Sequence, residues 1–66
     1  MNIKVNGEIR EIAEGTTLLE LIRALGLESK VMAAALNMQI VKQDGWGNAV
    51  LNEGDAVELL DFVGGG

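Results

Sequence analysis

Hydrophobic and polar residues alternate at the start of the chain. Ile3 and Val5 alternate with polar residues, and the pair Asn6-Gly7 separates this stretch from a second one. Asn-Gly readily adopts the two positive φ angles of a type I′ turn, so the pattern predicts a β-hairpin. Ile9 and Ile12 of the second stretch differ in parity, which predicts a bulge or an early end to strand pairing there.

Aliphatic residues then recur at the spacing of a helix. Four of them occupy positions i, i+3, i+4 and i+7, which predicts a helix whose apolar stripe covers one face of a sheet. Thr17 and Glu20 form a capping box at its start, and Gly26 suits the left-handed position at its end. The four aliphatic residues are Leu18, Leu21, Ile22 and Leu25.

The second half of the chain predicts three more strands. The run over residues 31–36 is apolar without polar alternation, and its short length favours a buried strand over a helix. Residues 40–42 form a short strand, and residues 56–63 form the last one. A turn signal at residues 52–55 precedes the last strand, and Asp55 is expected to close that turn.

Trp46 lies in the polar stretch between the short strand and that turn. It is the only tryptophan, with Gly45 and Gly47 on either side. We interpret it as a hydrophobic plug that closes one end of a small core, with a binding role as the alternative. The surrounding residues 43–48 are expected to form a loop.

The last strand is predicted to carry apolar residues on both faces. Val57 and Leu59 point to one side, whereas Leu60 and Phe62 point to the other. If the helix covers Val57 and Leu59, then Leu60 and Phe62 form an exposed apolar patch of the kind that often marks a binding site. The alternative is that a loop covers them.

These elements predict an α+β domain with a mixed sheet of four to five strands and one main helix packed on one face. Because the hairpin and helix come first, a crossover has to return the chain over the sheet, and the right-handed rule leaves few topologies. A β-grasp arrangement is the most economical of them. We expect one domain over residues 1–63 and a flexible glycine tail over residues 64–66.

Composition narrows the chemistry that this domain can carry out. The 66 residues contain no cysteine and no histidine, which removes the usual thiol nucleophile, general base and metal ligands. The carboxylates show no paired spacing with a third ligand, so we expect solvated surface, no metal site and no catalytic residue. With a net charge of −5 and no basic stripe, nucleic acid is an unfavourable partner, and a basic protein surface fits better. No apolar run approaches the ~18 residues of a membrane span, and we expect a cytoplasmic protein.

The glycine tail is the remaining candidate for chemistry. Gly64, Gly65 and Gly66 carry no Cβ, so an extended tail fits a groove too narrow for other residues and presents an unhindered carboxylate at Gly66. That carboxylate is inert at neutral pH until it is activated, and adenylation by ATP is the usual means. A frayed end without function is the alternative.

Several segments together carry a family resemblance. They are Ile3-Lys4-Val5-Asn6-Gly7-Glu8, Glu14-Gly15-Thr16-Thr17-Leu18, Leu21-Ile22, Leu25-Gly26-Leu27, Ala34-Ala35-Leu36-Asn37, Ile40-Val41, Trp46, Gly54-Asp55-Ala56-Val57-Glu58 and Val63-Gly64-Gly65-Gly66. In this order and spacing, over the whole length, the chain resembles the ThiS family of sulfur carriers, which belongs to the ubiquitin-like β-grasp group.

The resemblance implies a cycle in thiamine biosynthesis in which the chain is a substrate and not an enzyme. A ThiF-type, E1-like enzyme adenylates the Gly66 carboxylate with ATP and magnesium, and a cysteine desulfurase system supplies the sulfur that converts it to a thiocarboxylate. A ThiG-type thiazole synthase then takes up the sulfur, with the Gly65-Gly66 tail in its active site. Leu60 and Phe62 are the expected docking surface.

One segment departs from the family pattern, and two other functions stay open. Lys42-Gln43 stands where these carriers commonly have Pro-Arg, which affects any partner contact made by that arginine. Related carriers of the same fold and tail serve molybdopterin synthesis or other sulfur-transfer pathways, and others are protein modifiers. Thiolation and conjugation begin with the same acyl-adenylate, so the sequence does not separate them.

Overall fold

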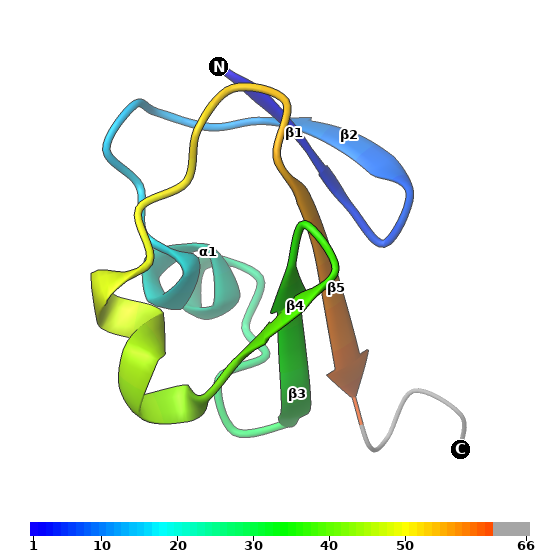
Figure 1. The fold of residues 1–66 in the computed structure, drawn as a ribbon, viewed down its shortest axis with the longest axis vertical. Helices are drawn as coiled ribbons and strands as arrows, with labels where there is room; N and C mark the ends of the chain where they lie inside the picture. Colours follow the sequence, from blue (N-terminus) through cyan, green and yellow to red (C-terminus); the bar gives the residue numbers. More distant parts are fainter. Residues whose placement is uncertain (62–66) are drawn as a thin grey trace.

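A computed structural model of the chain describes residues 1–61 as a five-stranded mixed sheet with one main helix packed on one face (Figure 1). The strand order is β2-β1-β5-β3-β4, with β5 parallel to β1 and antiparallel to β3. The predicted α+β class and the predicted β-grasp arrangement are confirmed. The elements are β1 Asn2–Val5, β2 Glu8–Glu11, α1 Leu18–Ala24, β3 Val31–Leu36, β4 Gln39–Val41, the 3-10 helix η1 Gln43–Asn48 and β5 Ala56–Asp61.

The first hairpin has the predicted type I′ turn, because Asn6 and Gly7 both have positive φ angles, of 50° and 86°. The predicted bulge or early end to pairing in the second strand is wrong: pairing is in regular register along β1 and β2, and main-chain hydrogen bonds between Met1 and Ile12 continue it. The parity of the isoleucines has a simpler cause. Ile9 pairs with an outward-facing residue of β1 and is itself 69% exposed, so the two isoleucines lie on opposite faces.

Helix α1 begins and ends where the sequence predicts. The Thr17 hydroxyl accepts a hydrogen bond from the Glu20 amide at 3.1 Å, and the Glu20 carboxylate accepts one from the Thr17 amide at 2.9 Å. This capping box satisfies amides that have no partner within the helix. Gly26 follows the helix with a φ of 72°, the left-handed conformation that ends helices.

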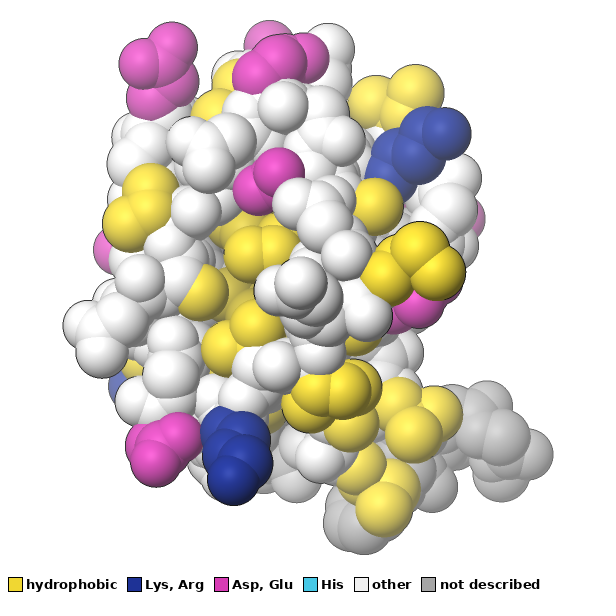
Figure 2. Space-filling view, in the orientation of Figure 1, with side chains coloured by type: hydrophobic (Ala, Val, Ile, Leu, Met, Phe, Trp, Pro, Cys, Tyr) yellow, Lys and Arg dark blue, Asp and Glu magenta, His cyan; other side chains and the backbone are white. Residues whose placement is uncertain are grey.

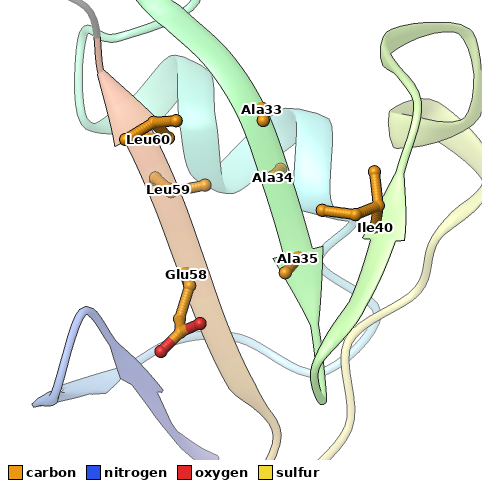
Figure 3. Close-up of a pocket in the computed structure, with 7 residues that line it drawn as sticks. All are labelled: Ala33, Ala34, Ala35, Ile40, Glu58, Leu59 and Leu60. Atoms are coloured by element: carbon orange, nitrogen blue, oxygen red, sulfur yellow. The ribbon is translucent and has the colours of Figure 1, made fainter.

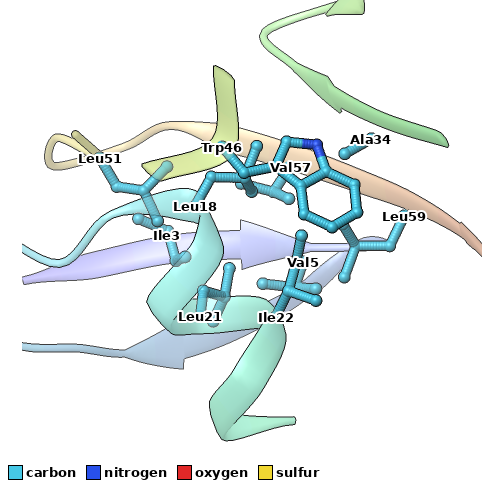
Figure 4. Packing of buried hydrophobic residues seen from close by; sticks show 10 residues of the cluster. All are labelled: Ile3, Val5, Leu18, Leu21, Ile22, Ala34, Trp46, Leu51, Val57 and Leu59. Carbon is cyan, nitrogen blue, oxygen red and sulfur yellow. The ribbon is translucent and has the colours of Figure 1, made fainter. Parts of the chain in front are cut away.

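The core lies between α1 and the inner face of the sheet (Figure 4). Trp46 is 1% exposed, and its indole N–H donates to the main-chain oxygen of Val41 at 2.9 Å, so its interpretation as a core plug is confirmed. The segment around it, predicted as a loop, is the 3-10 helix η1. The buried residues are Ile3, Val5, Leu18, Leu21, Ile22, Ala34, Trp46, Leu51, Val57 and Leu59.

Strand β3 has the predicted bounds but is not a buried strand. Of its residues only Ala34 is buried, and Met32 is 60% exposed. The pairing of β3 with β5 shifts register between Val31 and Ala33, which is a bulge at Met32. The apolar run is explained by contacts on both faces. Val31 and Leu36 pack against the core beside Ala34, whereas Ala33 and Ala35 line an open apolar surface.

The turn before β5 also follows the prediction. The Asp55 carboxylate accepts a hydrogen bond from the Asn52 amide at 2.8 Å, and the Asp55 amide donates to the Asn52 oxygen at 3.0 Å. Gly54 supplies the positive φ, of 83°, that the turn needs. Asp55 therefore closes the turn that starts the last strand.

Candidate functional site

Strand β5 presents different residues to its two faces. Val57 and Leu59 are 1% and 8% exposed and pack in the core, whereas Leu60 is 60% exposed on the opposite, outer face. The prediction that the helix covers one side of β5 and leaves Leu60 free is confirmed. Phe62 and the glycines 64–66, the other residues of the predicted site, lie outside the described residues.

An open hollow of about 270 Å³ lies beside Leu60 on the outer face (Figure 3). The strand register places Ala33 opposite Leu60 and Ala35 opposite Glu58, and on the other side of β3 it places Ala35 opposite Ile40. The two alanines form a low floor because they lie between the larger side chains of Leu60 and Ile40, which is 71% exposed. We call this surface, formed by Ala33, Ala35, Ile40, Glu58 and Leu60, the outer groove.

The sequence prediction included Leu60 but missed the other members of the outer groove. Ala33 and Ala35 come from the run that was assigned to a buried strand, and Ile40 comes from the short strand next to it. The sequence signal was the run Ala33-Ala34-Ala35. Because successive residues of a strand point to opposite faces, one of these alanines faces the core and two face outward. Figure 2 shows hydrophobic side chains gathered toward the lower part of the sheet, near the end of β5.

Two asparagines hold β5, one at its start and the other along its middle. The main-chain N–H of Asn6 donates to the Val57 oxygen at 2.9 Å, and its side-chain Oδ1 accepts a hydrogen bond from the Leu59 N–H at 2.8 Å. The main-chain N–H of Asn37 donates to the Ala56 oxygen at 2.8 Å, and its side-chain Oδ1 accepts a hydrogen bond from the Ala56 N–H at 2.9 Å. Both asparagines have positive φ angles in hairpin turns, of 50° and 51°. Sequence reasoning assigned Asn6 to the turn but missed this second contact.

Three of the acidic residues within the described part of the chain serve local structure. Glu20 caps α1, Asp55 closes its turn, and a Glu53 carboxylate oxygen accepts the Asn2 amide at 2.8 Å. Residues 1–61 contain no group of three side chains that could hold a metal ion. Over the same residues, no helix has the length and apolar composition that crossing a membrane requires.

The sheet order, the single covering helix and the strand that leads from the outer groove into the glycines define a small β-grasp domain. Comparisons with known proteins agree. The chain belongs to the ThiS family, whose family model matches residues 3–66.

The relatives include one free-standing carrier and two larger enzymes. The chain is 32% identical to the sulfur carrier protein ThiS of Escherichia coli, and the match covers all of both chains. It is 33% and 38% identical to thiazole synthases of Paramagnetospirillum magneticum and Magnetococcus marinus. The match covers all of this chain but only 20% of each enzyme, so the chain spans about a fifth of their length.

A solved structure supports the same assignment. The crystal structure of the thiamine biosynthesis protein ThiS from Geobacter metallireducens superposes with a TM-score of 0.83 at 34% identity, and the match covers all of both chains. The solution structure of a thiamine biosynthesis protein from the same organism has a TM-score of 0.79 at 34% identity.

The backbone at Lys42 would accept the proline that the family resemblance leads us to expect there. Lys42 has a φ of −69° and a ψ of 156°. Proline fixes φ near −65° and is tolerated on edge strands, and β4, which ends at Val41, is an edge strand of this sheet. Lys42-Gln43 therefore changes the side-chain chemistry at this position without requiring a different path of the chain.

Proposed function

We propose that this chain is a sulfur carrier of thiamine biosynthesis that bears the sulfur on the carboxylate of Gly66. The observation that carries the proposal is the end-to-end match with the Escherichia coli sulfur carrier protein ThiS, which includes the tail. In this proposal residues 1–63 are the folded body that partners recognise, and residues 64–66 are the tail that enters their active sites.

Every step of the proposed cycle takes place at the carboxyl group of Gly66. A carboxylate oxygen of Gly66 attacks the α-phosphorus of ATP on a ThiF-type enzyme, and pyrophosphate leaves with its magnesium. A persulfide on a cysteine desulfurase system then attacks the acyl carbon and AMP leaves, and a thiol supplied by that system reduces the resulting acyl disulfide. The product is a thiocarboxylate. The chain contributes the acyl group, and its absence of cysteine keeps any thiol of its own from competing for the acyl-adenylate.

We assign docking of the activating enzyme to the outer groove, which includes Leu60, and to Phe62. Leu60 lies on the strand that continues into the tail, so a partner that covers it is also close to the residues that follow. The outer groove is apolar except for Glu58, and the whole chain has a net charge of −5. An apolar patch with basic groups at its rim is the complementary surface.

A ThiG-type thiazole synthase is the proposed acceptor of the sulfur. Support comes from the two thiazole synthases that contain a segment matching this whole chain within about a fifth of their length. A carrier segment and a synthase on one polypeptide have a high effective concentration for each other, which is useful when the two partners act in sequence. Transfer in another sulfur pathway, such as molybdopterin synthesis, and conjugation to a protein are the alternatives.

The experiment combines the chain with a ThiF-type enzyme, ATP and magnesium, and measures the release of pyrophosphate. The wild-type chain is expected to release pyrophosphate, whereas a variant with one residue added after Gly66 is not, although its circular dichroism matches that of the wild type. If the extended variant releases pyrophosphate without being trimmed, the assignment of the reactive carboxylate to Gly66 is wrong.

A further inference from the structure

Strand β5 loses one of its two neighbours before it reaches the tail. Its parallel pairing with β1 covers only Ala56 and Val57, because β1 ends at Val5 and the chain then turns through Asn6 and Gly7 (Figure 1). Pairing with β3 on the other side continues as far as Asp61. The second half of β5 is therefore held on one side by a strand and on the other side by whatever the turn provides.

The turn provides the side chain of Asn6. Its Oδ1 accepts the Leu59 amide at 2.8 Å, at the place where a longer β1 would have offered a main-chain oxygen. The Asn6 main chain is itself tied to the same strand, because its amide donates to the Val57 oxygen at 2.9 Å. Asn6 thus contacts β5 at both Val57 and Leu59 and extends the pairing by one hydrogen bond past the end of β1.

We propose that Asn6 is a positioning residue for the activation of the tail, an inference that rests on the proposed function. Leu59 precedes Leu60, and the hydrogen bond at its amide fixes the direction in which both the docking residue and the root of the tail leave the body. Gly66 follows Leu59 by seven positions in the sequence, so the segment that reaches the activating enzyme starts from this part of β5. Misplacement of a reacting group by about 1 Å can already cost a large factor in rate.

Asn6 offers variants that separate its hydrogen bond from its backbone conformation. Asn6→Gly removes the acceptor and keeps a residue that tolerates the φ of 50°. Asn6→Asp keeps an oxygen acceptor of the same reach and also tolerates this conformation. The matched control is Asn37→Gly, because Asn37 has a φ of 51° and accepts a β5 amide in the same way, but at Ala56, the end of the strand far from the tail.

The experiment measures activation kinetics with a ThiF-type enzyme at saturating ATP, over a range of carrier concentrations. We expect Asn6→Gly to lower kcat by about 3- to 10-fold, the scale of one net hydrogen bond, and Asn6→Asp to restore it to within about twofold. Asn37→Gly is expected to keep the kcat of the wild type. A purely structural role would only reduce the folded fraction, which raises the apparent KM and leaves kcat unchanged.

Amide hydrogen exchange of the free protein provides a readout that does not depend on activity. The Leu59 amide of the wild type is expected to be protected, and Asn6→Gly is expected to accelerate its exchange while Val57 stays protected. An unprotected Leu59 amide in the wild type, or a wild-type kcat in Asn6→Gly, overturns the positioning role alone. If the wild-type chain releases no pyrophosphate, the proposed function fails, and the role of Asn6 in activation fails with it.

Discussion

Replacing Leu60 with alanine tests docking separately from folding, because Leu60 and its neighbour Leu59 lie on opposite faces of β5. Leu60 is 60% exposed and Leu59 is 8% exposed. Complete burial of a leucine side chain is worth about 1.5–3 kcal/mol. A partner that covers the exposed part of Leu60 therefore gains about 1–2 kcal/mol, and Leu60→Ala is expected to weaken binding of the ThiF-type enzyme by roughly 5- to 30-fold.

The same substitution is expected to leave the fold almost unchanged. Leu60→Ala should lower the free energy of unfolding by less than about 1 kcal/mol, because most of the side chain is already in water. Leu59→Ala removes a buried side chain and should cost about 2–5 kcal/mol. Urea denaturation followed by the fluorescence of Trp46, which is 1% exposed, gives both values.

A second exposed residue provides the control for the binding measurement. Ile9 is 69% exposed, but it lies on β2, two strands away from β5 in the sheet order. Ile9→Ala removes a similar apolar side chain outside the outer groove and is expected to leave Kd unchanged, as measured by titration calorimetry. If Leu60→Ala binds within twofold of the wild type, or if Ile9→Ala weakens binding equally, the docking assignment is wrong.

Three further substitutions test how the sequence specifies the fold. Thr17→Ala removes the capping box of α1 and should cost about 1 kcal/mol of unfolding free energy in a urea titration, and a loss near zero would contradict the cap. Gly26→Ala meets no neighbouring atom but has to adopt a φ of 72°, so it should lower the free energy of unfolding by about 1–2 kcal/mol. The control Gly47→Ala, whose Cβ would lie 3.7 Å from Leu19, should lower it much less. Equal thermal midpoints of the two variants would refute the backbone argument. Lys42→Pro matches the local φ of −69°, so it is expected to raise the free energy of unfolding by up to about 1 kcal/mol and not to lower the thermal midpoint. An unfolded Lys42→Pro variant would show that the main-chain N–H of Lys42 is needed.

Local sequence signals were sufficient for the elements that depend on neighbouring residues. Asn6-Gly7 specified its turn type, Thr17 and Glu20 specified the start of α1, and the parity of Val57 and Leu59 specified the buried face of β5. Each of these features is set by φ angles, by hydrogen bonds within a few residues or by side-chain alternation. Such features depend on the local chain and not on which strands become neighbours.

Features that depend on which strands become neighbours were missed. The bulge lies at Met32, where β3 pairs with β5, and not in the second strand where the isoleucine parity suggested it. The outer groove needs Ala33 and Ile40 beside Leu60, and only the strand order β5-β3-β4 brings them together. The contact of Asn6 with Leu59 spans 53 residues, and its partner is a main-chain amide that carries no sequence signature.

The central claim concerns one group of atoms, the carboxylate of Gly66, and intact-mass spectrometry tests it most directly. The chain is purified after coexpression with the activating enzyme and the sulfur source from its own cell, and compared with the chain expressed alone. The account predicts a species whose mass increase corresponds to the replacement of one oxygen by one sulfur, located by fragmentation at Gly66. Unmodified protein alone, with both partners present and active, would contradict it.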